Sequence, residues 1–405
     1  MKVLMLGNRV PFPLNDGGNL AVSNMMEGLL AENIELSLLL MNTSRHWVEE
    51  GQLPPLFKKL KSCTLVPVDN RIKPLHALYH LIKKNSYNLE RFITDKFETA
   101  LEAILKKEKF DLILLEGLFV TPYLKTIREF SKATVCYRQH NVEFQIWERL
   151  ANNSKNSLKK YYYKKLAAAL KTYEIEMCNQ YDCIAAISPI DAEYYKQLGC
   201  HLPILNIPYG LKSEQLIQKQ ANFTAPLKLY HIGAMDWQPN IDAINWFLKN
   251  VWPKILNKAP QTTLYLAGRN MPESFKRQNW KNVYVLGEVA DAKVFEADKH
   301  ILIVPLHSGG GLRIKILESM AAGKAVISTR VGIQGIDASI NSNEIIIADD
   351  VEGFANACIY LINNPDKAQH LGQQGKAFIE NKYRQNIVIK KLLEGLKEIP
   401  NRKKH

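Results

Sequence analysis

The sequence has no apolar segment that approaches the roughly 18 residues needed to cross a bilayer, and its cysteines follow no paired motif. Six cysteines are spread over the chain without Cys-x-x-Cys or zinc-finger spacing, so we expect free, mostly buried thiols in a reducing compartment. Only the short apolar run Val3–Leu6 separates Lys2 from Gly7, which is too short for a signal peptide. We therefore expect a cytoplasmic protein.

Several motifs of phosphate and metal sites are also missing. No glycine loop is followed by Gly-Lys-Ser/Thr, which excludes a Walker A site, and no Gly-x-Gly-x-x-Gly supports a dinucleotide site. No Asp-x-Asp follows an expected strand, and no His/Asp cluster has the spacing of metal ligands. We therefore expect neither a metal nor a cofactor.

The composition is typical of a soluble globular protein. The 405 residues are 46% hydrophobic, which is enough for two domains with separate cores. The formal net charge of +13 suggests contact with phosphates, an anionic membrane or nucleic acid, although a generic solubilising surface also explains it.

Short apolar runs alternate with helical stretches in both halves of the chain, which is typical of parallel sheets covered by helices on both faces. The expected strands are 2–7, 34–41, 110–117, 133–140, 182–188, 227–233, 263–268, 283–287, 300–306, 325–329 and 344–349, with a first helix over 21–33 and a helical tail over 370–399.

This alternation of expected strands and helices predicts two Rossmann-like, doubly wound α/β domains. We expect the first over 1–205, a linker over 206–226 and the second over 227–375, followed by a C-terminal helix over 376–405 that crosses back to the first domain. Doubly wound folds bind ligands at the carboxyl ends of their strands, so two such domains facing across a cleft place a ligand there.

The stretch "PLHSGGGLRIKILESM" combines three glycines with two cations at the start of an expected helix. Arg313 and Lys315 oppose the helix dipole there, which is tolerated when an anion binds. A diphosphate fits, since Gly309–Gly311 let backbone N–H groups approach it. Glu318 lies two turns along and suits the hydroxyls of a ribose. A surface ion pair between Lys315 and Glu318 is the alternative.

"VPLHSGGGLRIKILESMAAGKAVISTRVGIQGI", "HIGAMDWQPNIDAINWF" and "YRQHNVEFQIWERLA" resemble the retaining glycosyltransferases of family 4 (glycosyl transferases group 1), which have the GT-B fold. The resemblance implies metal-independent transfer from a nucleotide sugar, a UDP- or GDP-sugar, to a glycan or lipid-linked glycan in cell-surface polysaccharide synthesis. Gly310 stands where the family has the first glutamate of its pair, and Gln334 where relatives often have glutamate.

Position and resemblance together select the candidate site residues. Arg313 and Lys315 are expected to stabilise the leaving diphosphate, and His140, at the end of an expected strand, the transition state. The donor-binding candidates are Gly233, Arg269, Glu288, Val289, Gly309, Gly310, Gly311, Leu312 and Glu318. The acceptor-binding candidates are Gly17 and Gly18 (after Asp16), Glu116 and Asn141.

Some of these residues have structural alternatives. A histidine at a strand end is often structural, Glu116 could cap a helix, and a tight loop explains Gly17 and Gly18 almost as well. Trp237 and Asn240 also match the pattern of the family's subgroup, although Trp237 could equally pack in the core. The segment 157–174, "SLKKYYYKKLAAALKTYE", predicts a basic, aromatic helix that suits peripheral contact with the inner face of an anionic membrane, or a solvated helix face.

Two other functions remain open from the sequence. A nucleotide-sugar epimerase of the same fold would need acid and base carboxylates but no acceptor. A non-catalytic binder of membrane or nucleic acid would show salt-sensitive binding that Glu318→Ala leaves unchanged; for the transferase we expect no nucleic acid partner.

Overall fold

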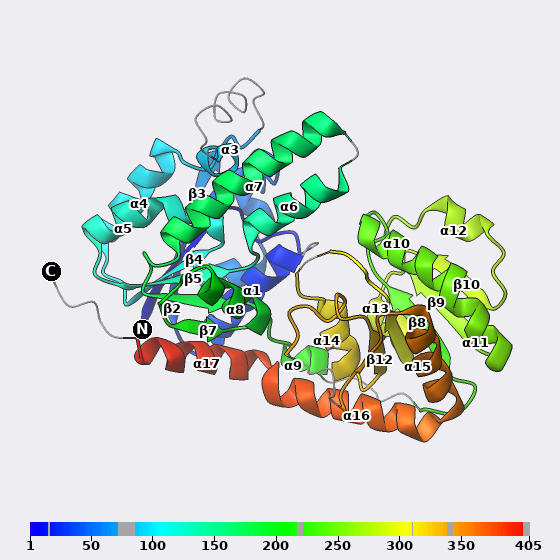
Figure 1. Cartoon of the computed structure of the whole chain (residues 1–405). Helices are drawn as coiled ribbons and strands as arrows, with labels where there is room; N and C mark the ends of the chain where they lie inside the picture. Colours follow the sequence, from blue (N-terminus) through cyan, green and yellow to red (C-terminus); the bar gives the residue numbers. More distant parts are fainter. Residues whose placement is uncertain are drawn as a thin grey trace. The chain divides into compact units, whose positions relative to one another are not determined.

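The computed structural model describes residues 1–14, 17–71, 86–154, 156–216, 222–309, 311–337 and 343–399. Asp16, Gly310, residues 217–221 of the expected linker and residues 400–405 of the expected C-terminal helix lie outside this part of the chain. The chain forms two compact units, each built on its own sheet (Figure 1). Unit 1 comprises Met1–Pro208 and the segment from Ile389 onward, and unit 2 comprises Tyr209–Val388.

Within the described residues, unit 1 contains a seven-stranded parallel sheet in the order β3-β2-β1-β4-β5-β6-β7. Its central strands are buried nearly throughout, because helices cover both faces. The strands are β1 (Lys2–Gly7), β2 (Glu35–Thr43), β3 (Ser62–Val68), β4 (Leu112–Glu116), β5 (Thr134–Gln139), β6 (Cys183–Ala186) and β7 (Ile204–Asn206).

Side chains cap several helices of unit 1 at their start. The Thr94 and Ser188 hydroxyls accept hydrogen bonds from Phe97 N and Asp191 N, which satisfies N–H groups of two helix starts. The α-helices are α1 (Gly17–Ala31), α3 (Tyr87–Glu90), α4 (Asp95–Lys107), α5 (Leu124–Phe130), α6 (Glu143–Asn153), α7 (Ser157–Met177) and α8 (Pro189–Gln197). Short 3-10 turns are η1 (Glu50–Gln52), η2 (Pro55–Lys59) and η3 (Leu118–Tyr123).

In unit 2 the described residues form a six-stranded parallel sheet in the order β10-β9-β8-β11-β12-β13. The strands are β8 (Lys228–Ile232), β9 (Thr263–Ala267), β10 (Val283–Gly287), β11 (Ile301–Val304), β12 (Ala325–Ser328) and β13 (Ile346–Ile347). The helices are α9 (Ser213–Leu216), α10 (Gln238–Trp246), the π-turn η4 (Phe247–Val251), α11 (Trp252–Lys258), α12 (Glu273–Arg277), α13 (Ala292–Glu296), α14 (Ile314–Ala321), α15 (Val351–Asn363) and α16 (Pro365–Lys382).

The two doubly wound sheets confirm the expected fold class, with local differences. The strands β3 and β7 were not expected, because both lie at a sheet edge, where half-exposed positions interrupt the apolar pattern. The expected helical tail is two helices, α16 and α17 (Gln385–Lys397). The first helix begins four positions earlier than expected, at Gly17.

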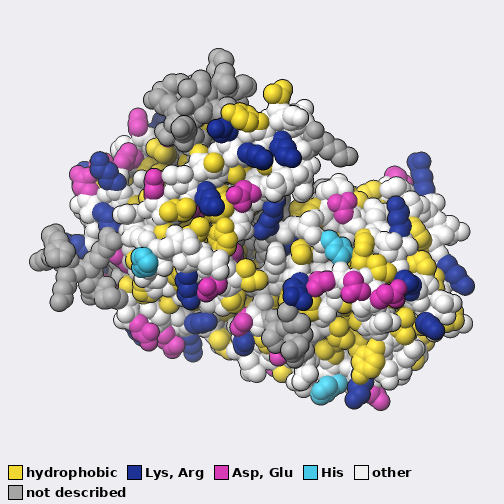
Figure 2. Space-filling view, in the orientation of Figure 1, with side chains coloured by type: hydrophobic (Ala, Val, Ile, Leu, Met, Phe, Trp, Pro, Cys, Tyr) yellow, Lys and Arg dark blue, Asp and Glu magenta, His cyan; other side chains and the backbone are white. Residues whose placement is uncertain are grey.

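Each unit has its own hydrophobic core. The core of unit 1 includes Phe97 and Tyr123, and that of unit 2 includes Phe247 and Trp252. As expected, all six cysteines are free, and five of them are buried. Among the described helices, none is long and apolar enough to span a bilayer. On the face shown in Figure 2, lysines and arginines are scattered among acidic side chains rather than gathered in one patch.

Candidate functional site

The glycine loop of unit 2 follows β11 and leads into α14, and Arg313 is the N-cap residue of that helix. The Arg313 side chain is buried, its Nη1 donates to Gly311 O at 2.8 Å, and its guanidinium lies 4.9 Å from the centre of the Trp237 ring. Gly309 has a φ of +104°, and a Cβ there would lie 2.5 Å from the Trp237 ring. The Trp237 ring therefore packs against both the glycine loop, at Gly309, and the Arg313 guanidinium.

Lys315 extends from the first turn of α14 to the carboxyl end of β8. Its Nζ donates to Ile232 O at 2.9 Å and lies 3.4 Å from His231 Nε2 and 3.5 Å from Asn240 Oδ1. The His231 ring places Nδ1 2.9 Å from Ile303 O, and a carbonyl only accepts, so Nδ1 carries the hydrogen. The lone pair of Nε2 then faces Lys315 Nζ, so His231 orients the Lys315 side chain.

Burial and nearby charges shift the pKa values of Lys315 and of the titratable groups around it. Burial, followed by repulsion from Arg313, lowers the pKa of Lys315 to about 7, while the charge of Glu296 opposes this. Burial and then the positive charge of Lys315 lower the pKa of His231 well below its usual value, so this ring is neutral. Burial, followed by the charge of Glu318, raises the pKa of Glu296 to about 7. An anion binding beside Lys315 would favour its charged form.

The carboxyl end of β8 needs glycine for close approach. A Cβ on Gly233 would lie 2.9 Å from Asn240 Nδ2 and 3.0 Å from Lys315 Nζ. A Cβ on Gly268 would lie 1.8 Å from Gly233 O, which no side chain can meet. The Lys315 ammonium thus lies beside the Gly233 backbone, and the Arg313 guanidinium is close enough for its charge to lower the Lys315 pKa. A diphosphate could bind beside these groups.

Glu318 and Lys315 point to different partners. Glu318 Oε1 accepts from Gln215 Nε2 at 2.9 Å, and Lys315 reaches β8. Neither residue pairs with the other among the described ion pairs, so the surface ion pair considered above is not formed. Burial raises the pKa of Glu318, and the hydrogen bond from Gln215 opposes the shift.

The remaining donor candidates lie on loops of unit 2. Arg269 Nη2 is 3.6 Å from Asp236 Oδ2 in a half-exposed ion pair. Glu288 is exposed and Val289 half-buried in the loop after β10, and neither contacts the Lys315 group in any recorded interaction of the described residues. Leu312 packs against Gly335, where a Cβ would lie 3.1 Å from Leu312 Cδ1.

The predicted residues of unit 1 meet at the carboxyl ends of β4 and β5. Glu116 Oε2 lies 2.7 Å from His140 Nε2 and 2.9 Å from Arg138 Nη1, and the Glu116 side chain is 1% exposed. Burial opposes ionisation of Glu116, but the charge of Arg138 and the hydrogen bond with His140 outweigh it and lower the Glu116 pKa. An ionised carboxylate only accepts, so His140 donates from Nε2 and its Nδ1 is left for a ligand.

These residues share one cavity of about 300 Å³. Gly18, Glu116, His140 and Asn141 line it, and Gly17 precedes Gly18 at the start of α1. Glu116 Oε1 is buried and accepts no hydrogen bond within the described part of the chain. Helix capping does not account for Glu116, because its carboxylate pairs with His140 and Arg138.

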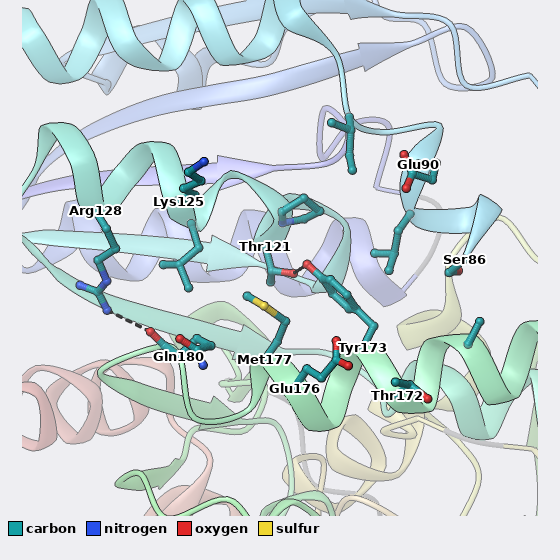
Figure 3. Close-up of a pocket in the computed structure, with 15 residues that line it drawn as sticks. Ser86, Glu90, Thr121, Lys125, Arg128, Thr172, Tyr173, Glu176, Met177 and Gln180 are labelled. Atoms are coloured by element: carbon teal, nitrogen blue, oxygen red, sulfur yellow. Dashed lines mark hydrogen bonds between the residues drawn. The ribbon is translucent and has the colours of Figure 1, made fainter. Parts of the chain in front are cut away.

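A larger cavity of about 800 Å³ lies elsewhere in unit 1, between α5 and α7. Figure 3 shows its lining, in which the hydroxyls of Thr121 and Tyr173 face each other at 2.9 Å and Arg128 donates to Gln180 O. It contains none of the candidate catalytic, donor-binding or acceptor-binding residues. Size alone therefore does not identify the site.

Several residues around the site were not selected from the sequence. His231, Trp237 and Asn240 all lie in the quoted stretch "HIGAMDWQPNIDAINWF", and Arg138 lies in "YRQHN". His231 and Arg138 lie near the carboxyl ends of β8 and β5, next to residues already chosen, whereas Trp237 and Asn240 lie at the start of α10. Among the described residues, no group of three His, Cys, Asp or Glu side chains is placed to hold a metal ion.

Known proteins resemble the chain over most of its length. Residues 226–364 match the family described as Glycosyl transferases group 1. A Klebsiella pneumoniae protein described as an "Uncharacterized 44.6 kDa protein in cps region" is 22% identical over 396 residues, which cover 94% of this chain and 96% of that protein.

Solved glycosyltransferase structures share the fold. Sucrose-phosphate synthase from Thermosynechococcus elongatus has a TM-score of 0.69 and 16% identity, with 97% of this chain and 98% of that chain covered. Anabaena HepE in complex with UDP-glucose has a TM-score of 0.63 and 13% identity, with 98% and 99% covered. The chain therefore has the GT-B fold, and its residues 226–364 match the glycosyl transferases group 1 family.

Proposed function

We propose that the protein is a retaining, metal-independent glycosyltransferase that moves a sugar from a UDP- or GDP-sugar to a hydroxyl of a glycan or glycolipid in surface polysaccharide synthesis. The observation that carries this proposal is the position of Lys315 Nζ at the carboxyl end of β8, beside Gly233, with the Arg313 guanidinium close enough for its charge to lower the Lys315 pKa. Two cations and a backbone without side chains suit the diphosphate of such a donor.

The proposed step breaks the bond between the anomeric carbon and the β-phosphate oxygen, whose electron pair goes to the diphosphate. Arg313 and Lys315 stabilise the charge that develops there, which lowers the barrier. The acceptor hydroxyl oxygen forms the new bond on the same face, and its proton passes to a phosphate oxygen of the leaving group. His140, held by Glu116, stabilises the transition state, and Glu318 binds the ribose.

The direct test is release of UDP or GDP from a panel of nucleotide sugars, with and without a mixture of glycan acceptors. A transferase releases nucleotide quickly only with acceptor, and NMR of the product reads the anomeric configuration. An epimerase would instead convert the donor without releasing nucleotide. Thermal shifts with the same panel identify the donor, since a ligand at 100 times its Kd stabilises by about 2.7 kcal/mol.

The titration of Lys315 predicts a pH dependence of nucleotide binding. With a pKa of about 7, the Lys315 side chain is mostly a neutral amine at about pH 8, and a bound diphosphate raises that pKa. UDP binding at about pH 8 should therefore take up close to one proton. Since the protonated form binds better, affinity is highest below pH 7 and falls as the pH rises above it.

Calorimetry of UDP binding in two buffers with different ionisation enthalpies measures this uptake. Lys315→Arg is the matched control, because arginine keeps its charge throughout this range and should abolish the uptake. The same uptake in wild type and Lys315→Arg would mean that another group titrates.

Peripheral contact with an anionic membrane is a further part of the proposal. Near the start of α7, Leu158 is 82% exposed and Tyr161 57% exposed, and Lys159, Lys160, Lys164 and Lys165 lie on the same helix. Apolar side chains among lysines suit the interface of anionic lipid, and each lysine near the surface contributes about 1 kcal/mol.

Flotation with vesicles tests this contact. We expect binding to vesicles with phosphatidylglycerol and none to pure phosphatidylcholine, and Leu158→Ser/Tyr161→Ser should reduce it several-fold. Ile190→Ser, at a position 57% exposed on α8, is the control for loss of an exposed apolar side chain. Equal binding of the double variant and wild type would exclude this helix as the contact.

A further inference from the structure

The unit 1 cavity that contains Glu116 and His140 is also lined by arginine. Besides His140 and Glu116, the roughly 300 Å³ space is lined by Arg9, Arg45 and Arg91. These residues follow β1, β2 and α3, so three separate elements of the fold bring guanidinium groups to one small cavity. Its volume is at the lower end of the range for small-molecule sites.

The charges of Arg45 and Arg91 are not neutralised by acidic side chains. No described carboxylate forms an ion pair with either residue, and the Nε of Arg91 is buried without a hydrogen-bond acceptor in the described chain. The one hydrogen bond recorded for Arg91 is long, 3.4 Å from Nη1 to Asn70 O. Burial, followed by repulsion from Arg45, lowers the pKa of Arg91, so the two guanidinium groups are close enough to interact.

The acidic side chains of the cavity do not cancel this charge. Glu116 is engaged by Arg138 and His140. Burial, followed by the charge of Glu174, raises the pKa of Glu143 to about 8, so the Glu143 carboxyl is protonated at neutral pH. The described side chains that line the cavity therefore carry a net positive charge. Guanidinium groups held in this way, without a counter-ion, are stabilised when an anionic group binds between them.

We propose that the acceptor is a sugar that carries an anionic group, a phosphate or a carboxylate, and that Arg45 and Arg91 bind this group. The inference rests on the proposed function, because it concerns the acceptor of that transfer. The planar guanidinium suits both anions, since each presents two oxygens in one plane. A hydroxyl of the same sugar then lies toward Glu116 and His140, which line the same cavity.

The test is the affinity of the full chain for three probes: glucose 1-phosphate, glucuronate and glucose. They are titrated by calorimetry at constant ionic strength into wild type, Arg45→Gln, Arg91→Gln and Arg91→Lys. We expect the anionic sugars to bind at least tenfold more tightly than glucose. Each glutamine variant should lose about tenfold of that affinity, since it removes a charge-assisted hydrogen bond. Arg91→Lys should lose less, because it keeps the charge.

Two further variants assign the site. Arg149→Gln removes an exposed arginine of α6 that donates to Gln145, outside the cavity, and should change nothing. Arg313→Gln removes the unit 2 cation, so anion binding that survives this variant belongs to unit 1. Arg45 is exposed, so Arg45→Gln should keep the fold and unfolding temperature of wild type.

Each outcome decides the question. Tighter binding of glucose 1-phosphate than of glucuronate assigns a phosphate, and the reverse order assigns a carboxylate. Glucose binding as tightly as both, or unchanged anion affinity in Arg45→Gln and Arg91→Gln, overturns the inference. Titration of UDP into the same variants separates this inference from the proposed donor site. If wild type binds anionic sugars through Arg91 but does not bind UDP, only the donor site is contradicted.

Discussion

Replacing Lys315 with methionine should lower kcat about 100-fold, the loss seen when one donor to a developing oxyanion is removed. Methionine keeps the length and most of the volume of the side chain but removes the ammonium that lies 2.9 Å from Ile232 O. The lost group is one we assign to the leaving diphosphate, so the effect should fall on turnover as well as on nucleotide affinity. Arg313→Ala should lower turnover at least tenfold for the same reason.

Lys254→Met is the matched control for this prediction. Lys254 lies on α11 of the same unit, pairs with Glu352 at 2.6 Å and is 45% exposed, so its loss removes the same charge at a surface position. Its kcat should stay within about twofold of wild type, because exposed pairs contribute little. A similar loss in both variants would show that net charge, and not the position of Lys315, matters.

Replacing His140 with alanine should lower kcat about 100-fold while the Kd for UDP stays nearly unchanged. The groups that we assign to nucleotide binding lie in unit 2, whereas His140 lies in unit 1 with Glu116 and Arg138. A side chain that donates or accepts a proton, or carries charge, in the transition state contributes about 100-fold or more to the rate. Steady-state kinetics and calorimetry of UDP binding measure the two quantities separately.

Glu116→Gln tests how His140 is held. The amide can donate as well as accept, so it no longer selects the form of His140 with a hydrogen on Nε2. We expect a fall in kcat and a changed pH profile. Arg138 loses its buried partner, so the unfolding temperature should also fall. His201→Ala, at an exposed loop position, is the control. A large loss of UDP affinity in His140→Ala would contradict its assigned role.

The fold could be predicted because buried parallel strands are nearly continuous apolar runs. The runs that became β1, β4 and β5 were visible for this reason, whereas the edge strands β3 and β7 alternate with exposed positions and were not. Arg313 and Lys315 could be selected because cations are unfavourable at a helix start unless an anion binds.

What the pattern could not show is which side chains meet across the sheet. His231 and Lys315 are 84 positions apart, and their contact depends on the strand order β8-β11, which periodicity does not reveal. The pairing of Glu116 with His140 likewise depends on the register of β4 against β5. The arginines of the cavity follow different elements, so only the folded sheet brings them together.

The most direct test of the central claim is a crystal structure of the full chain with UDP. We predict the diphosphate at the start of α14, with a β-phosphate oxygen about 3 Å from Lys315 Nζ and a second contact to Arg313. UDP bound away from Gly309 to Lys315, or bound without contact to either cation, would contradict the assignment of this loop to the donor.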